Sequence, residues 1–206
     1  RTLKQQHPRA VVVTYINSSA AVKAETDVCC TSSNAVNVVR SLADAGEIIF
    51  VPDKYLGTYV SGRTGRDLIL WHGYCPTHVR IQPEDILRRK QEHPKAKVAA
   101  HPECTPGVLA LADAVLSTEG ICKYAQQPEV SELIVCTEIG VLYRLHKENP
   151  GKKFYPVSDA ASCPNMKKTT LEKVLWSLER MQHEVKVPED IAVRARSAVD
   201  RMLAIA

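Results

Sequence analysis

One segment of this chain occurs twice. KQQHPRAVV, from Lys4 to Val12, returns as KQEHPKAKV, from Lys90 to Val98, 86 positions further along. The same ungapped offset produces further identities: Asp27 and Asp113, Ile48 and Ile134, and Leu56 and Leu142. Identities in one register over this length predict that a whole structural unit is present in two copies, which must then share a fold.

Each copy alternates short apolar runs with helical patterns. The strand-like runs are residues 10–16, 27–31, 47–52 and 68–72 in the first copy and 96–101, 113–117, 132–137 and 153–157 in the second. The helical stretches are residues 19–26 and 32–42, then 106–112 and 118–128. Alternating strands and helices predict an α/β fold of repeated three-layer αβα domains with parallel four-stranded sheets.

We place the repeats at residues 1–86 and 87–168, as two pseudo-symmetric domains around a shared site. Residues 169–206 are expected to form two amphipathic helices that close the fold, with Thr169 or Thr170 as an N-cap and Pro188 in a first turn. The segment GTYVSGRTGRD, residues 57–67, is rich in Gly and Arg and is expected to be a mobile loop, as a lid or an electrostatic guide.

Composition narrows the function classes. The net charge of the 206 residues is +4 with no long run of one sign, which argues against a nucleic-acid-binding stripe. No window has 18 consecutive apolar residues, so no membrane partner is expected. Seven cysteines at irregular spacing, without a secretory signal, predict a reducing, cytoplasmic location. The chain starts without Met and in the middle of a pattern, so we expect it to be part of a longer protein.

Polar residues follow the first strand of each copy at matching positions. They are Tyr15 and Asn17 in the first copy and His101 and Glu103 in the second. Two residues with one spacer point the same way from an extended segment. Ligands of parallel sheets gather at the carboxyl ends of the strands, so these four are candidate site residues, although each could also be part of the scaffold.

Hydroxyl residues follow the second strand of each copy. Ser32 and Ser33 stand in the first copy, and Ser117 and Thr118 in the second. A hydroxyl at a strand-to-helix turn, with free backbone N–H groups and the helix dipole behind it, can bind an anion. The same residues could simply cap the helices, which is compatible with anion binding.

Two cysteines match between the copies. Cys75 and Cys163 are 88 positions apart, each follows the fourth strand, and each precedes a proline. Paired thiolates that converge near a common axis suit a soft metal or an iron–sulfur cluster. We interpret His72 and His78 as scaffold, although they flank Cys75, and His7 and His93 as structural. Cys104 stays open, and the remaining cysteines are expected to be small buried hydrophobes: Cys29, Cys30, Cys122 and Cys136.

Several motifs together resemble the quinolinate synthase (NadA) family over essentially the whole chain. They are TYINSSAAVKAETDVCCTSSNAV, FVPDKYLG, WHGYCPTH, HPEC, ADAVLSTEGI and SCPNMKKTTLEKV. The resemblance implies three pseudo-repeated α/β domains around a central site and a 4Fe-4S cluster held by one cysteine from each domain. It also implies an enzyme of NAD biosynthesis that condenses iminoaspartate with dihydroxyacetone phosphate, eliminating water and phosphate to give quinolinate.

The resemblance assigns roles to the residues that match its motifs. Cys75 and Cys163 are the expected cluster ligands of the second and third domains. Glu103 is the expected general base or acid, with His101 beside it and Tyr15 polarising a carbonyl or protonating a leaving hydroxyl. The substrate-binding residues implied are Tyr15, Asn17, Ser32, Ser33, His101, Glu103, Ser117 and Thr118. The first domain and its cysteine are expected to be missing from this chain, and L-aspartate oxidase is the implied supplier of iminoaspartate.

Two other functions compete with this interpretation. The two repeats could form a truncated, non-catalytic fragment that binds anions or a metal through its hydroxyl turns and thiols. A zinc hydrolase is disfavoured, because the chain has no CxxC, HxH or HExxH pair and zinc sites commonly use short ligand pairs.

Overall fold

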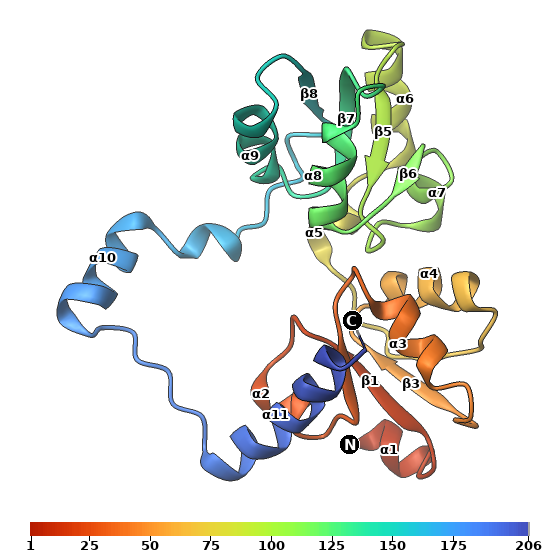
Figure 1. Ribbon diagram of the computed structural model, residues 1–206, viewed down its shortest axis with the longest axis vertical. Coiled ribbons are helices and arrows are strands. Elements are labelled where there is room, and N and C mark those ends of the chain that lie inside the picture. The colour runs from red at the N-terminus through yellow and green to blue at the C-terminus, as the bar shows by residue number, and fades with distance from the viewer. Residues whose placement is uncertain (206) are drawn as a thin grey trace.

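The computed structural model describes residues 1–205, which form two lobes, each built around a parallel four-stranded sheet (Figure 1). The first sheet has the order β2-β1-β3-β4, and its strands are β1 (Val11–Tyr15), β2 (Val28–Cys30), β3 (Ile48–Val51) and β4 (Ile69–Leu70). The second has the order β6-β5-β7-β8, with β5 (Lys97–Ala100), β6 (Ala114–Val115), β7 (Glu132–Cys136) and β8 (Lys153–Pro156). The predicted repeated α/β fold is confirmed.

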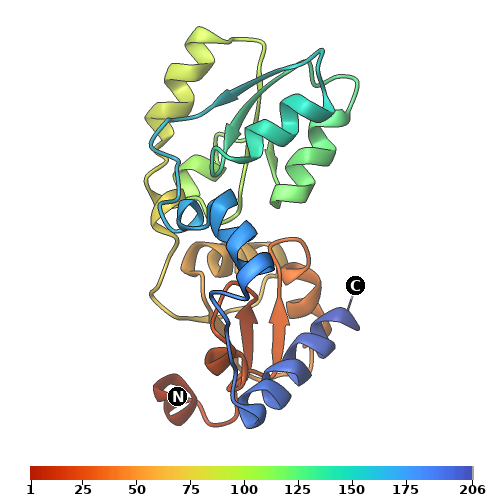
Figure 2. The same ribbon diagram turned by 90° about the vertical axis from the view of Figure 1, so that its left-hand side faces the viewer.

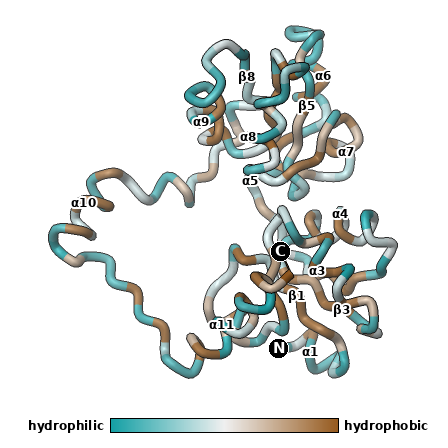
Figure 3. Tube along the Cα trace, in the orientation of Figure 1, coloured by the Kyte–Doolittle hydropathy of each residue, from teal (hydrophilic) through white to brown (hydrophobic). Residues whose placement is uncertain are grey.

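Helices cover both faces of each sheet, and the lobes stay distinct when the molecule is turned (Figure 2). The helices of the first lobe are α1 (Thr2–Gln6), α2 (Ala20–Lys23), α3 (Ala35–Ser41) and α4 (Lys54–Thr64). After the linking turn α5 (Pro76–Val79), the second lobe has α6 (Pro83–Glu92), α7 (Pro106–Leu109), α8 (Thr118–Gln126) and α9 (Val141–Glu148). Strand residues are the largest group in the apolar core, and Figure 3 shows the hydropathy along the chain.

The C-terminal segment forms an arm that leaves the second lobe and returns to the first (Figure 1). It holds the 3₁₀ turn η1 (Met166–Lys168) and the helices α10 (Leu171–Arg180) and α11 (Glu189–Leu203). As predicted, the Thr170 hydroxyl caps α10, accepting from Lys173 N–H. Ala198 and Met202 of α11 are buried in the first core, whereas no residue of α10 is buried. No helix within residues 1–205 combines the length and apolarity needed to cross a membrane.

The internal repeat is visible in individual hydrogen bonds. The backbone N–H of Val12 donates to Asp27 Oδ2 over 2.8 Å, and the N–H of Val98 donates to Asp113 Oδ2 over 2.7 Å. In each copy the carboxylate stands just before the second strand and pairs a donor of the first strand that has no strand partner there. Asp27 and Asp113 therefore have the same structural role in the two copies.

The ungapped offset is wrong by one residue at the third strand. In the sheets Val12 pairs with Ile49, and Val98 pairs with Ile134, so Ile49 rather than Ile48 is the counterpart of Ile134. Burial agrees with this register. Ile48 faces the core shared with α3 and α4, whereas Ile49 belongs to the cluster on the other face of the first sheet. Ile134 packs with Ile86 of α6 on the corresponding face of the second sheet. The second copy is one residue shorter between its second and third strands, so Leu56 likewise does not match Leu142.

The prediction of a mobile loop at residues 57–67 is also wrong, because most of this segment lies in helix α4. Asp53 caps the helix through Oδ1, which accepts from the N–H groups of Tyr55 and Leu56, and Gly65 ends it with a positive φ of 69°. Gly57 packs the helix tightly on the sheet, since a Cβ there would lie 2.5 Å from Leu70 Cδ2. The glycine that suggested flexibility instead permits close packing.

The repeated carboxylate bond gives a stability prediction. Asp27→Ala leaves the N–H of Val12 without an acceptor at a largely buried strand, which should lower the free energy of unfolding by about 1–3 kcal/mol. Urea denaturation followed by circular dichroism measures the change. Asp44→Ala, at an exposed position, is the matched control, and equal stability of the two variants would contradict the assigned role of Asp27.

Candidate active site

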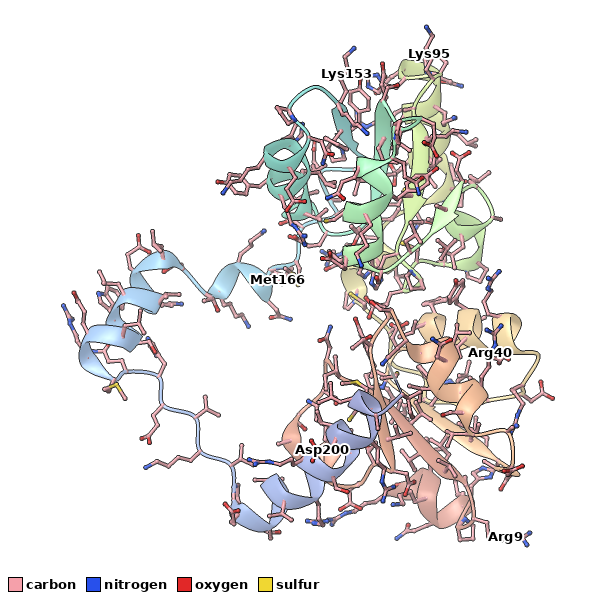
Figure 4. All side chains as sticks on the ribbon, in the orientation of Figure 1. Arg9, Arg40, Lys95, Lys153, Met166 and Asp200 are labelled. Atoms are coloured by element: carbon pink, nitrogen blue, oxygen red, sulfur yellow. The ribbon has the colours of Figure 1, made fainter. Side chains whose placement is uncertain are left out.

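A cavity of about 830 Å³ lies where the carboxyl ends of the two sheets approach each other. Both lobes line it, and the start of the C-terminal arm adds Met166, labelled in Figure 4. Seven of the residues predicted from sequence line this cavity: Tyr15, Asn17, Cys75, His101, Glu103, Thr118 and Cys163. Parallel strands bring their carboxyl ends to one edge, which explains why residues so distant in sequence meet here.

The three predicted serines lie beside the cavity and join the lobes. Ser33 Oγ donates to Ser117 Oγ across the lobes over 2.9 Å, and Ser32 Oγ lies 3.2 Å from His101 Nε2. Ser117 also caps α8, accepting from the N–H of Gly120 over 3.1 Å. The capping alternative therefore holds for Ser117, and the hydroxyl turns bring the two repeats into contact.

The two matched cysteines are held in equivalent ways. The N–H of Cys75 donates to Asp53 Oδ2 over 2.6 Å, and the N–H of Cys163 donates to Glu138 Oε1 over 3.2 Å. Both acids stand directly after the third strand of their copy, in the corrected register. In each copy, a carboxylate on one loop thus positions the backbone of the neighbouring loop that carries the cysteine.

The cysteines differ in exposure as predicted. Cys75 and Cys163 are partly exposed at the cavity, whereas Cys29, Cys30, Cys122 and Cys136 are buried. Cys104 is also structural, since it is buried and its Sγ donates to the carbonyl of Cys136. The N–H of Met166, helped by the hydroxyl of Thr77, lowers the pKa of Cys163 below that of an ordinary thiol.

His78 and Glu103 form a buried ion pair at the centre of the cavity. His78 Nδ1 lies 2.9 Å from Glu103 Oε2, a short contact with poor hydrogen-bond alignment, and His78 Nε2 lies 2.9 Å from Thr137 Oγ1. Burial lowers the pKa of His78, but Cys75 and the Glu103 carboxylate outweigh it and raise this pKa to about 9. Burial opposes ionisation of Glu103, yet its contact with His78 leaves its pKa below the usual value.

His101 stacks on His78, with ring centroids 4.7 Å apart and planes 20° from parallel. Burial, followed by the charge of His78, lowers the pKa of His101 to about 4. Its Nδ1 accepts from the N–H of Glu103 over 3.3 Å, which leaves Nε2 as the protonated nitrogen that donates to Ser32. The stacked pair thus combines one charged and one neutral imidazole.

His78, which we interpreted from the sequence as scaffold, lines the cavity. A usable signal was present, because Cys75 and His78 are three residues apart and α5 is helical, so both side chains can share one face. Asp53, Thr137, Glu138 and Lys167 also line the cavity and were not predicted. They come from loops after the third and fourth strands. Asp53 and Lys167 stand in the motifs FVPDKYLG and SCPNMKKTTLEKV without an assigned role, and Thr137 and Glu138 stand in no motif.

The donor set suits a metal. One ligand atom each of Cys75, His78 and Glu103 lies within 4.8 Å of the others. Sulfur and imidazole nitrogen are ligands of zinc and of iron, whereas thiolates from several loops are typical of iron–sulfur clusters.

Residues 1–204 match the family described as quinolinate synthetase A protein. The chain belongs to the quinolinate synthase family. It is 55% identical over 205 residues to quinolinate synthase 1 of Methanosarcina acetivorans, covering 100% of this chain and 67% of the relative. It is 57% identical over 205 residues to the quinolinate synthase of Dehalococcoides mccartyi strain CBDB1, with 100% and 68% covered. The quinolinate synthase of Geotalea uraniireducens is 55% identical over 203 residues, with 98% and 66% covered.

These relatives are enzymes by name, and the chain spans about two thirds of their length. The family and the α/β fold expected from the motifs are both confirmed. The two repeats and the arm fill the matched part, so this family contains further sequence beyond what the two lobes represent.

The protonation of His101 gives a pH prediction. The unfolded imidazole takes up a proton near pH 6.5 and the folded one only near 4, so unfolding should become easier as pH falls between these values, by up to about 3 kcal/mol. Chemical denaturation from pH 4 to 7 measures this slope, which should shrink in His101→Gln. The exposed His183→Gln is the matched control, and an NMR titration of His101 centred near 6.5 would contradict the prediction.

Proposed function

We propose that this chain supplies two of the three repeats of a quinolinate synthase, which condenses iminoaspartate with dihydroxyacetone phosphate in NAD biosynthesis. The observation that carries the proposal is the single cavity into which both repeats send a cysteine and a pair of polar strand-tip residues. The family membership supports the reaction, and the cavity supports the assignment of residues. The division into residues 1–86, 87–168 and 169–206 remains a prediction.

Cys75 and Cys163 would hold two corners of a 4Fe-4S cluster. Three observations fit this cofactor: both thiols are accessible from one cavity, both backbones are pinned by a carboxylate, and the Thr77 hydroxyl beside Cys75 contacts Cys163. The third thiolate would come from the further part of the protein. When bound, a cluster with one open iron supplies a Lewis acid that polarises a hydroxyl or carboxylate oxygen.

Glu103 would act as the general base and acid. It is buried, its pKa is lowered by His78, and its ionised carboxylate faces the cavity, so it can accept a proton from a substrate carbon or hydroxyl. The positive charge of His78 keeps Glu103 ionised until that proton arrives. Thr137 Oγ1 holds the other nitrogen of His78 and orients the ring.

Tyr15 would serve as a proton donor or carbonyl polariser. Burial and then the charge of Glu103 raise its pKa well above the usual value, so the phenol stays protonated and can donate. Ser32 contacts both Tyr15 and His101, and it thereby links the strand tips of the two repeats. Neutral His101 can donate or accept a hydrogen bond without adding charge to the site.

The remaining polar groups would bind the anionic substrates. Asn17 and Thr118 line the cavity from different lobes, and Ser33 and Ser117 join the lobes next to it. Lys167 lies in the cavity, 3.0 Å from Glu138, and a substrate carboxylate or phosphate could compete for it. We place the reaction in the cytoplasm, where free thiols persist, and propose L-aspartate oxidase as the supplier of iminoaspartate.

A second candidate follows from the trio Cys75, His78 and Glu103. Sulfur, nitrogen and oxygen atoms within 4.8 Å could bind one zinc ion in the chain alone, as a metal-binding module without turnover. The carboxylate pinning of Cys163 favours the cluster, because that thiol is not part of the trio. Metal analysis distinguishes the two candidates. Iron and sulfide with an absorbance at about 400 nm support the cluster, whereas a colourless protein with one zinc ion per chain supports the module.

The cluster assignment gives a substitution test. After anaerobic reconstitution of this chain together with the remaining third of the Dehalococcoides relative, Cys75→Ala and Cys163→Ala should each lose most of the bound iron and the visible absorbance. Cys122→Ala, a buried cysteine of α8, is the control and should keep both. Full iron content in both cavity variants would refute the ligand assignment.

The role of Glu103 is tested in the same reconstituted protein. Glu103→Gln should lower quinolinate formation by roughly 10²–10⁴-fold, because the amide cannot accept the proton, while the cluster absorbance stays unchanged. Exposed Glu129→Gln is the matched control. Normal turnover by Glu103→Gln with an intact cluster would rule out Glu103 as the base.

A further inference from the structure

Arg144 is a cation of the cavity whose partners both stand outside it. Arg144 belongs to α9 and lines the cavity, whereas Glu119 and Glu148, the two acids that hold it, are not among the lining residues. Arg144 Nη1 donates to Glu119 Oε2 over 2.7 Å, and Arg144 Nε donates to Glu148 Oε1 over 2.7 Å. Two carboxylates, one from each of the helices α8 and α9, therefore hold the guanidinium at the rim of the cavity (Figure 1).

The other positive charges of the cavity pair with acids that also line it. Among the described lining residues these pairs are His78 with Glu103 and Lys167 with Glu138. The carboxylates of both pairs are at most 10% exposed, whereas those of Glu119 and Glu148 are 53% and 33% exposed. Exposed ion pairs contribute little to stability, so an incoming anion can replace them at low cost. Arg144 is thus the cation of the cavity that an entering anion recruits most easily.

The internal repeat shows that this charge belongs to the second lobe alone. At the offset of 86, Glu119 corresponds to Ser33, and in the corrected register after the third strand Arg144 corresponds to Tyr59. Tyr59 packs against the core of the first lobe, and Ser33 donates to the other lobe. The ion pair therefore makes the two sides of the cavity chemically different. It also lies beside the hydroxyl turn of the second lobe, because Glu119 directly follows Thr118, which lines the cavity.

The surroundings of Arg144 match a phosphate monoester better than a single carboxylate. Two carboxylates at 2.7 Å bring two negative charges to one guanidinium, and a phosphate dianion brings the same charge in one group. Arginine binds phosphate oxygens bidentately through its planar fork of N–H donors. A phosphate that displaces Glu119 therefore replaces a weak exposed contact with a stronger one.

We propose that Arg144 recruits the phosphate of the substrate at the rim of the cavity, and that Glu119 holds the guanidinium until the phosphate arrives. The phosphate displaces Glu119, while Glu148 keeps its contact with Nε and holds the side chain in place. Arg144 then determines specificity for a phosphate-bearing substrate and fixes its phosphate end on the side of the second lobe. This inference rests on the proposed function, because it takes dihydroxyacetone phosphate as the ligand.

Phosphate binding to this chain tests the proposal. Dihydroxyacetone phosphate and inorganic phosphate are titrated separately and followed by ³¹P NMR. Arg144→Gln should weaken the binding of both by about fivefold or more, because the charged bidentate contact is lost. Glu119→Gln should strengthen it by about threefold or more, because the guanidinium no longer has to be released. The exposed Lys147→Gln and Glu129→Gln make the same charge changes away from the cavity, where salt screens them, and should stay within about twofold of the parent.

A double variant separates a direct contact from a general effect of charge. Arg144→Gln combined with Glu119→Gln has the net charge of the parent, so a general effect predicts binding like that of the parent. In the proposed arrangement Glu119 acts only through Arg144, so the double variant should bind as weakly as Arg144→Gln alone. Binding of the double variant at the level of the parent, or no phosphate binding by the parent, would overturn the proposal.

L-Aspartate, a dicarboxylate without phosphate, tests the specificity. Arg144→Gln should change its affinity by less than about twofold, and a larger loss for aspartate than for phosphate would contradict the assignment. Buried Ile121, Ala125 and Leu145 hold α8 and α9 in the core, so loss of an exposed pair should leave the fold intact, which circular dichroism checks. Should Arg144→Gln nevertheless unfold, the gain expected for Glu119→Gln, which keeps the cation, still decides.

These measurements need neither iron nor quinolinate formation. Their failure would therefore remove the role of Arg144 and leave the cluster ligands and Glu103 to their own tests.

Discussion

The arrangement depends on one constraint: all strands of each sheet are parallel, so each sheet gathers its loop residues at one edge. The two edges face each other across a single cavity, and short hydroxyl contacts between Ser33 and Ser117 and between Ser32 and His101 join them. The residues that line this cavity come from these edges and from the start of the C-terminal arm. The turns with His7 and His93 lie at the opposite end, before the first strand of each repeat.

Carboxylates position the backbone in both repeats. Asp27 and Asp113 complete the first strands, and Asp53 and Glu138 hold the backbones of the two cavity cysteines. At the centre, Glu103 shares its charge with His78 while His101 stays neutral. Because every one of these acids has a backbone or imidazole partner, the cavity can concentrate ionisable groups without leaving a charge unpaired.

The two helices of the C-terminal arm differ in burial. Helix α11 returns to the first core through Ala198 and Met202, whereas α10 exposes its apolar side chains.

The sequence by itself determined the repeat and the α/β class through periodicity, and the family through its motifs. Strand-tip position and those motifs also identified seven residues that line the cavity. Only the tertiary structure decided the one-residue register shift at Ile49, since a single deletion between strands leaves the apolar pattern intact. It alone also showed that the Gly57 segment forms helix α4 and that His78 lines the cavity. Those outcomes depend on contacts with Leu70, Phe50 and Glu103, residues distant in the sequence whose approach no local pattern encodes.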